Sequence, residues 1–170
     1  MKYAISLGSN LGDSKTILTK ALTQLNQTSD VRIVARSSLY QTKALTLPGS
    51  PPQPDYLNAC ALLETALKPD ELLTVLQQIE IQFGRVRRER WGARTLDLDL
   101  LLCGELICKS ADLEIPHPRM LDRAFVLVPL AEIAPDWIHP IAGVSIAQLA
   151  SKIDQSDIKK LNIIDDTFIV

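Results

Sequence analysis

Apolar and polar residues alternate along several stretches of the chain, and this alternation predicts four β-strands. The predicted strands cover residues 3–7, 31–40, 56–65 and 94–102. Residues two apart in a strand share one face of a sheet, so each strand presents one apolar face and one more polar face. The pattern therefore predicts a sheet with its apolar face buried and its other face uncovered.

Two segments between these strands carry apolar residues at the helical period of 3.6 residues. The first begins after Asp13 or Ser14, either of which can cap a helix, and its apolar positions continue to Leu25. The second begins at Pro69, which suits the first helical position, and Gly84 is its C-terminal stop. The order βαββαβ is typical of the ferredoxin-like α+β fold, an antiparallel sheet with helices on one face.

A loop and a C-terminal segment complete the predicted arrangement. The loop covers residues 42–54 and is rich in proline, and a mainly helical stretch begins near residue 121. A chain of 170 residues suits one domain, because a domain of this size buries roughly 70% of its unfolded surface. We predict a single domain over residues 1–170, with a core over about 1–135 and a C-terminal extension over 136–170.

The composition argues against several classes of protein. The net charge of −2 at pH 7 disfavours general binding to nucleic acid or to anionic membranes. No apolar run approaches the roughly 18 residues of a membrane-spanning helix, and the N-terminal apolar run is too short for a signal peptide. The three cysteines show no metal-ligand spacing, so we expect reduced, largely buried thiols in a cytoplasmic protein.

The fourth predicted strand carries a pair of aspartates on one face. Asp97 and Asp99 are two residues apart, and the opposite face carries only leucines: Leu96, Leu98, Leu100 and Leu102. Burial of two unpaired carboxylates is prohibitive, so the leucines should face the helices and the aspartates the uncovered side. Magnesium accepts one or two carboxylates together with phosphate oxygens. A merely solvated strand face is the alternative interpretation.

A cluster of arginines lies just before the aspartates: Arg85, Arg87, Arg88, Arg90 and Arg94. Guanidinium groups bind phosphate oxygens in pairs and stay charged at physiological pH. Like-charged arginines this close together are unfavourable unless an anion lies among them. The arginines and aspartates together predict a site for a polyphosphate and its magnesium, with a solvent-exposed basic loop as the alternative.

Other side chains on the predicted open face suit a flat heterocycle. Tyr56 and Asn58 share a strand face, and small residues such as Gly8 leave room for a ligand. Trp91 and Phe125 are further aromatic candidates, although any one aromatic also fits a hydrophobic core. Four more candidates for nucleotide contact, which suit a solvated surface equally well, are Gln77, Glu80, His117 and Arg123.

Three classes of function stay open on these residues alone. A kinase that transfers phosphoryl groups from a nucleotide to a heterocyclic substrate would use the arginines, the aspartates and the aromatic pocket together. A metal-dependent phosphohydrolase or nuclease would need the aspartates but no such pocket, and a regulatory module that binds a small anion would need only the arginines. The chain has no Walker A, GxGxxG or HExxH sequence that would decide between them.

Several motifs together resemble one enzyme family over residues 3 to about 150. The most specific is Arg90-Trp-Gly-Ala-Arg-Thr-Leu-Asp-Leu-Asp99, and those that corroborate it are Gly8-Ser-Asn-Leu-Gly12, Asp55-Tyr-Leu-Asn-Ala59, Gly84-Arg-Val-Arg87, Ile115-Pro-His117, Arg123-Ala-Phe125 and Pro129-Leu-Ala-Glu-Ile-Ala-Pro135. They resemble the hydroxymethyl-dihydropterin pyrophosphokinase family of folate biosynthesis. The chain departs from the family pattern at Asp112 and Glu114, where basic and hydroxyl residues that contact the nucleotide are expected.

The resemblance implies transfer of a pyrophosphoryl group from ATP to 6-hydroxymethyl-7,8-dihydropterin, with release of AMP. It implies that Asp97 and Asp99 hold two magnesium ions and that Arg85, Arg94 and Asp97 serve catalysis. The implied ATP contacts are Gln77, Glu80, Arg87, Arg94, Leu100, His117 and Arg123. The implied pterin contacts are Gly8, Thr42, Leu45, Tyr56, Asn58, Trp91 and Phe125. We expect a monomer whose partners are these two small molecules, with no nucleic acid and no membrane.

Overall fold

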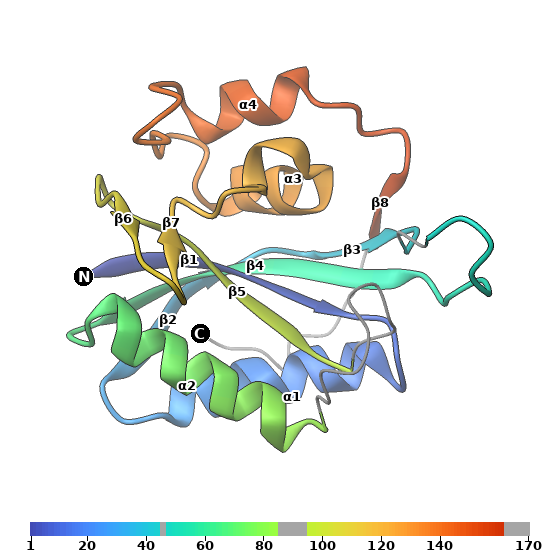
Figure 1. The fold of residues 1–170 in the computed structure, drawn as a ribbon, viewed down its shortest axis with the longest axis horizontal. Coiled ribbons are helices and arrows are strands. Elements are labelled where there is room, and N and C mark those ends of the chain that lie inside the picture. The colour runs from blue at the N-terminus through green and yellow to red at the C-terminus, as the bar shows by residue number, and fades with distance from the viewer. Residues whose placement is uncertain (45–46, 85–94, 162–170) are drawn as a thin grey trace.

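An antiparallel sheet forms the centre of the computed structural model, which describes residues 1–44, 47–84 and 95–161 (Figure 1). In the described residues its strands follow the order β5-β1-β4-β3-β8, and β2 also pairs with β4. Their bounds are β1 Lys2–Ser9, β2 Val31–Arg36, β3 Leu39–Thr42, β4 Tyr56–Thr65, β5 Asp97–Cys103 and β8 Ile158–Leu161.

Helices cover the sheet from both sides. Figure 1 shows α1 (Ser14–Gln27) and α2 (Pro69–Gln82) on one face, and α3 (Ala124–Ile133) and α4 (Ile146–Lys152) on the other. The small elements between β5 and α3 are β6 Cys108–Lys109, β7 Glu114–Ile115 and the 3₁₀ helix η1 Met120–Asp122. Among the described residues, no helix has the length and apolar character needed to cross a membrane.

The two predicted helices begin where the capping signals place them. The Asp13 carboxylate accepts a hydrogen bond from the Thr16 backbone N–H at 3.3 Å, which satisfies a free donor of the first turn of α1. Pro69 begins α2, and the Glu71 carboxylate accepts from the Lys68 backbone N–H at 2.9 Å. Local sequence therefore determines both helix starts.

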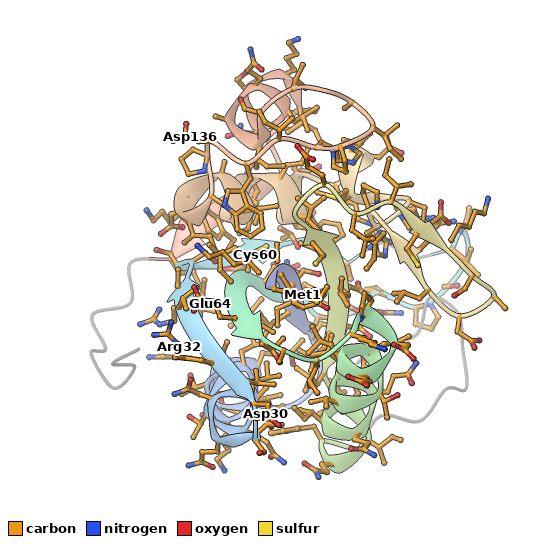
Figure 2. All side chains as sticks on the ribbon, turned by 90° about the vertical axis from the view of Figure 1, so that its left-hand side faces the viewer. Met1, Asp30, Arg32, Cys60, Glu64 and Asp136 are labelled. Atoms are coloured by element: carbon orange, nitrogen blue, oxygen red, sulfur yellow. The ribbon has the colours of Figure 1, made fainter. Side chains whose placement is uncertain are left out.

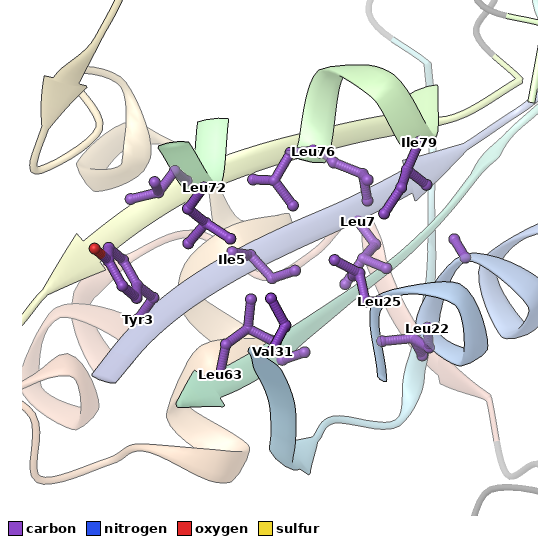
Figure 3. Close-up of a cluster of buried hydrophobic side chains, with 14 of the residues drawn as sticks. Tyr3, Ile5, Leu7, Leu22, Leu25, Val31, Leu63, Leu72, Leu76 and Ile79 are labelled. Carbon is purple, nitrogen blue, oxygen red and sulfur yellow. The ribbon is translucent and has the colours of Figure 1, made fainter. Parts of the chain in front are cut away.

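The face beneath α1 and α2 is the main hydrophobic core (Figure 3). Ile5 and Leu7 of β1 project toward Leu25 of α1 and Leu76 of α2, and all four are buried. Burial of one such side chain contributes roughly 1.5–3 kcal/mol, so this layer supplies much of the driving force for folding. The predicted alternation of β1 is confirmed.

One residue predicted for this core lies on the opposite face. A second hydrophobic cluster lies on the opposite face of the sheet, beneath α3. Leu100 packs in the main core, but Leu101 and Leu102 both pack in this second cluster. The register of β5 against β1 shifts between Ala4, which pairs with Leu102, and Ile5, which pairs with Leu100. This β-bulge inserts Leu101 and reverses the alternation after it, so the predicted placement of Leu102 is wrong.

The strand predicted over residues 31–40 is in fact two strands, β2 and β3, because Ser37 interrupts the ladder. The Ser37 hydroxyl accepts from the Cys60 backbone N–H at 2.9 Å and donates to the Ser38 carbonyl at 2.8 Å. The side chain thus replaces a backbone partner of β4 and lets the chain bend. Both halves still pair with β4.

The second face of the sheet is not left uncovered as predicted. Val126, Leu127 and Leu130 of α3 pack against Cys60 and Leu62 of β4, and α4 packs behind α3. The sequence also missed β8, which lies in the C-terminal extension and pairs with β3 along the sheet edge. The carboxylates and polar residues of this face therefore lie beside a helical layer rather than on an open sheet.

Candidate active site

A row of residues crosses the sheet on the face opposite α1 and α2. The strand registers pair Lys160 with Tyr40, Tyr40 with Asn58, Asn58 with Gly8, and Gly8 with Asp97. Directly opposed residues of neighbouring strands point to the same side, so all five share this face. The predicted convergence of an aspartate, an asparagine and a small glycine is confirmed.

The two aspartates project beside small neighbours. Asp97 lies opposite Gly8 and Asp99 lies opposite Ser6 on β1, and both carboxylates are partly exposed. The Asp99 carboxylate lies 3.9 Å from the Arg123 guanidinium. Two partly exposed carboxylates on one strand face, with little bulk beside them, fit a magnesium ion that also takes phosphate oxygens.

Glu80 has a clear structural contact within this site. It is only 3% exposed, and its carboxylate accepts from the Leu98 backbone N–H at 3.0 Å. Leu98 lies between the two aspartates, so Glu80 fixes the part of β5 that presents them. Gln77 lies three residues earlier on α2 and is half-buried. The predicted ATP contacts of both residues stay predictions.

Four predicted pterin residues, Gly8, Thr42, Tyr56 and Asn58, come together at the start of β4. The Asn58 amide donates to the Thr42 hydroxyl at 2.8 Å, and both side chains are buried. A Cβ atom added at Gly8 would lie 3.1 Å from Asn58 Oδ1 and 3.6 Å from the Tyr56 ring. Glycine thus keeps this corner open, and the Thr42 bond fixes which way the Asn58 amide points.

A cavity of about 290 Å³ opens beside Asp99. Its lining includes Asp99, Leu100 and His117, which the sequence assigned to metal and ATP contacts. Leu73 and Leu113 supply apolar walls, so the cavity suits a nucleotide base next to charged groups. Asp112 and Glu114, which stand where the family pattern has nucleotide contacts, also line the cavity, together with Ser110, to which the sequence assigned no role.

The His117 ring is held in a defined state. Burial lowers its pKa, the nearby Asp99 carboxylate opposes this, and Arg123 and Arg119 lower the pKa further. Its Nδ1 atom accepts from the Arg119 backbone N–H at 3.1 Å. A neutral ring that accepts at Nδ1 carries its proton on Nε2, so His117 offers an N–H donor to the cavity.

Arg123 connects the aspartates to the aromatic residue of α3. Its guanidinium lies over the Phe125 ring, 5.4 Å from the ring centre, and also beside Asp99. A cation held between a carboxylate and an aromatic face is well placed to meet a phosphate. The pterin contact predicted for Phe125 stays a prediction.

Several predicted residues lie outside the described part of the chain. They are Leu45, Arg85, Arg87, Arg88, Arg90, Trp91 and Arg94, so the structure does not test their roles. Within residues 1–44, 47–84 and 95–161, no group of three or more histidine, cysteine or acidic side chains could hold a metal alone.

The fold and the site define a ferredoxin-like α+β domain with carboxylates and an imidazole beside a cavity at the β5 edge of its sheet. The chain belongs to the 7,8-dihydro-6-hydroxymethylpterin-pyrophosphokinase (HPPK) family, whose sequence profile matches residues 4–135.

Two relatives support this assignment, and one solved structure shares the fold. The 2-amino-4-hydroxy-6-hydroxymethyldihydropteridine pyrophosphokinase of Synechocystis sp. is 47% identical over 150 residues, covering 88% of this chain and 75% of the relative. The Haemophilus influenzae protein of the same name is 46% identical over 158 residues, covering 93% and 96%. The wild-type Plasmodium falciparum HPPK-DHPS structure with pterin and p-hydroxybenzoate matches with a TM-score of 0.73 at 14% identity.

The structural match covers 97% of this chain but only 47% of the Plasmodium chain. This chain therefore spans about half of that two-part protein. At such low sequence identity the likeness shows the fold alone. It confirms the predicted ferredoxin-like α+β class.

Proposed function

We propose that this chain transfers the pyrophosphoryl group of ATP to the hydroxymethyl oxygen of 6-hydroxymethyl-7,8-dihydropterin, releasing AMP, as a step of tetrahydrofolate biosynthesis. Family membership and the names of the two relatives support this reaction. The observation that carries it is the row that places Asp97 next to Gly8 and Asn58. In that row, a carboxylate that could bind the magnesium of a polyphosphate lies beside a group of residues that could bind a heterocycle.

Asp97 and Asp99 would hold two magnesium ions together with oxygens of the ATP phosphates. Magnesium, when bound, supplies positive charge against the phosphate oxygens and orients the transferring group. The chain itself contributes Arg123 beside Asp99 and the Nε2–H donor of His117, both suited to phosphate oxygens. Arg85 and Arg94, outside the described residues, would add further positive charge during transfer.

The reaction needs in-line attack of the pterin hydroxyl on the β-phosphorus of ATP. A bond forms between that oxygen and the β-phosphorus. The bond between the β-phosphorus and the oxygen that bridges it to the α-phosphorus breaks, and AMP leaves with that oxygen. Asp97 is our candidate acceptor of the hydroxyl proton. Asn58 and Thr42 would hold the polar edge of the pterin, and the cavity lined by Leu100 would hold the nucleotide. Positioning of the two substrates then supplies most of the catalysis.

The direct test incubates the protein with ATP and magnesium, with and without the reduced pterin. AMP that forms only when pterin is present supports the proposal. ADP or phosphate that forms without pterin would instead indicate a phosphohydrolase. No turnover at all, with thermal stabilisation by ATP, would indicate a regulatory module that binds anions.

We also propose that the whole chain acts as one cytoplasmic, monomeric domain whose partners are the two small molecules. Size-exclusion chromatography with light scattering measures the oligomeric state directly. A thermal-shift titration with ATP, with and without magnesium, measures the contribution of the metal to nucleotide binding. A shift that does not depend on magnesium would contradict the assignment of Asp97 and Asp99.

A further inference from the structure

The row of residues that crosses the sheet from Lys160 to Asp97 is called the polar row below. Glu132 of α3 joins three elements at the end of this row farthest from Asp97. One carboxylate oxygen accepts from the Tyr40 hydroxyl at 2.6 Å, and the other accepts from the Ser38 hydroxyl at 2.7 Å. The Ser38 backbone N–H also donates to both oxygens at 3.1 Å, and Lys160 of β8 lies 3.8 Å away. A single side chain therefore connects α3 to β3 and β8.

The charge states make these contacts strong. Burial alone would raise the pKa of Glu132, but the hydrogen bonds from Tyr40 and Ser38 and the charge of Lys160 lower it, so the carboxylate is ionised. Burial and the same carboxylate raise the pKa of Tyr40, so the phenol keeps its proton and donates it. A hydrogen bond from a neutral hydroxyl to an ionised carboxylate is roughly twice as strong as one between neutral groups.

The contacts lead from Glu132 to the corner proposed for the pterin. Tyr40 lies directly opposite Asn58 across β3 and β4 and is only 5% exposed. Thr42 follows two residues later on the same face of β3 and accepts from the Asn58 amide at 2.8 Å. The position of β3 thus sets where the Thr42 hydroxyl lies and which way the Asn58 amide points.

We propose that Glu132 is a positioning residue for the pterin half of the site, acting through Tyr40 and β3 on Thr42 and Asn58. This inference rests on the function proposed above. The ATP half does not depend on β3, because the cavity is lined from α2, β5 and the segment from Ser110 to Pro118. Loss of Glu132 should therefore weaken the binding of a flat, hydrogen-bonding heterocycle and spare the nucleotide.

The test is steady-state kinetics of Glu132→Gln with each substrate varied in turn. Glutamine keeps the shape but replaces one acceptor oxygen with an NH₂ group, so either Tyr40 or Ser38 loses its partner. We expect the KM for the pterin to rise roughly tenfold, the cost of a lost hydrogen bond to a charged group, with the KM for ATP within about twofold. Tyr40→Phe should raise the pterin KM less, and adding it to Glu132→Gln should have little further effect.

Glu64→Gln is the matched control. The Glu64 side chain is 35% exposed against 27% for the Glu132 side chain, and Glu64 too joins neighbouring strands through cations. It pairs with Arg32, beside it in Figure 2, and with Lys2. It lies at the opposite end of β4 from Tyr56. Glu64→Gln should lower the melting temperature without changing either KM.

The outcomes separate the two proposals. A wild-type protein that forms no AMP contradicts the proposed function itself. A wild-type protein that forms AMP, with a Glu132→Gln variant that keeps its pterin KM or raises both KM values equally, overturns the positioning role. The same pterin-specific rise in Glu64→Gln would overturn it as well.

Discussion

The two faces of the central sheet are built in different ways. Beneath α1 and α2, apolar side chains such as Leu63 and Leu76 are fully buried, and only their apolar character and size matter for this packing. On the other face, α3 covers one part and a polar row from Lys160 to Asp97 occupies another. Cores tolerate exchange of similar apolar groups, whereas a polar group with one partner is sensitive to the change of a single atom. The comparison predicts that substitutions beneath α1 and α2 alter stability and that substitutions in the polar row alter function.

The largest effect should follow removal of either aspartate from the polar face. Asp97→Ala and Asp99→Ala should each lower turnover by about a thousandfold or more, because charge that stabilises the transition state is lost. The free energy of unfolding should change by less than about 1 kcal/mol, since both side chains are partly exposed. AMP formation and urea unfolding measure the two quantities, and chelation of magnesium should also abolish turnover in the wild type.

Asp136→Ala is the control for this pair, because Asp136 is exposed in the turn between α3 and α4 (Figure 2). It removes the same charge but should leave turnover unchanged. Full activity in either Asp97→Ala or Asp99→Ala would rule out the metal assignment for that residue.

On the apolar face, Leu76→Ala should have the opposite signature. Leu76 is fully buried in the main core, so its truncation should cost about 2–5 kcal/mol in the free energy of unfolding. Turnover per folded molecule and both KM values should stay within about twofold, because Leu76 lies under the sheet, away from the polar row. Urea unfolding, with activity measured well below the melting temperature, tests this division. A tenfold loss of turnover in the folded protein would show that the two faces are coupled.

The local sequence predicted much of this fold because the signals are themselves local. β4 has the bounds Tyr56–Thr65 that the alternation predicted, and α2 begins at Pro69. The bulge at Leu101 was not predictable, since it depends on how β5 pairs with β1. β8 was missed for the same reason, because its four residues become a strand only by pairing with β3.

In the candidate site, too, features set by local sequence were predicted, and contacts that depend on tertiary packing were not. Strand alternation alone predicted that Asp97 and Asp99 share a face, and the structure confirms it. Glu132 lies in a segment that helped define the family resemblance, but no role was assigned to it. Its partner Tyr40 is 92 positions away in the chain, so no local pattern reveals the contact. The bond from the Leu98 backbone N–H to Glu80 was not predicted, because it depends on the packing of α2 against β5.

A smaller effect should follow Gly8→Ala at the centre of the polar row. The added methyl group would lie 3.1 Å from Asn58 Oδ1, so the amide that also bonds Thr42 must shift by a few tenths of an ångström. We expect the KM for the pterin to rise roughly tenfold, because a displaced contact group is no longer aligned with the ligand. The KM for ATP should not change. Equal changes in both constants would mean that Gly8 serves the whole site rather than its pterin half.

The smallest effect concerns the helical layer that covers the second face. His139 lies in the turn between α3 and α4, is 2% exposed, and its Nδ1 atom accepts from the backbone N–H groups of Ile141 and Ala142 at 3.2 and 3.0 Å. Burial lowers its pKa, so the folded state favours the neutral ring. Stability from this group is complete above the unfolded pKa of about 6.5 and is lost as the pH falls below it.

The pH dependence of the melting temperature tests this assignment. His139→Asn keeps an acceptor near the Nδ1 position but cannot titrate, so its melting temperature should fall less than that of the wild type between about pH 7.5 and 5.5. His117, whose pKa is also lowered, is present in both proteins, so its contribution cancels in the difference. Identical slopes would mean that the turn between α3 and α4 tolerates a charged imidazole. In that case His139 would not make the stability of the helical layer depend on pH.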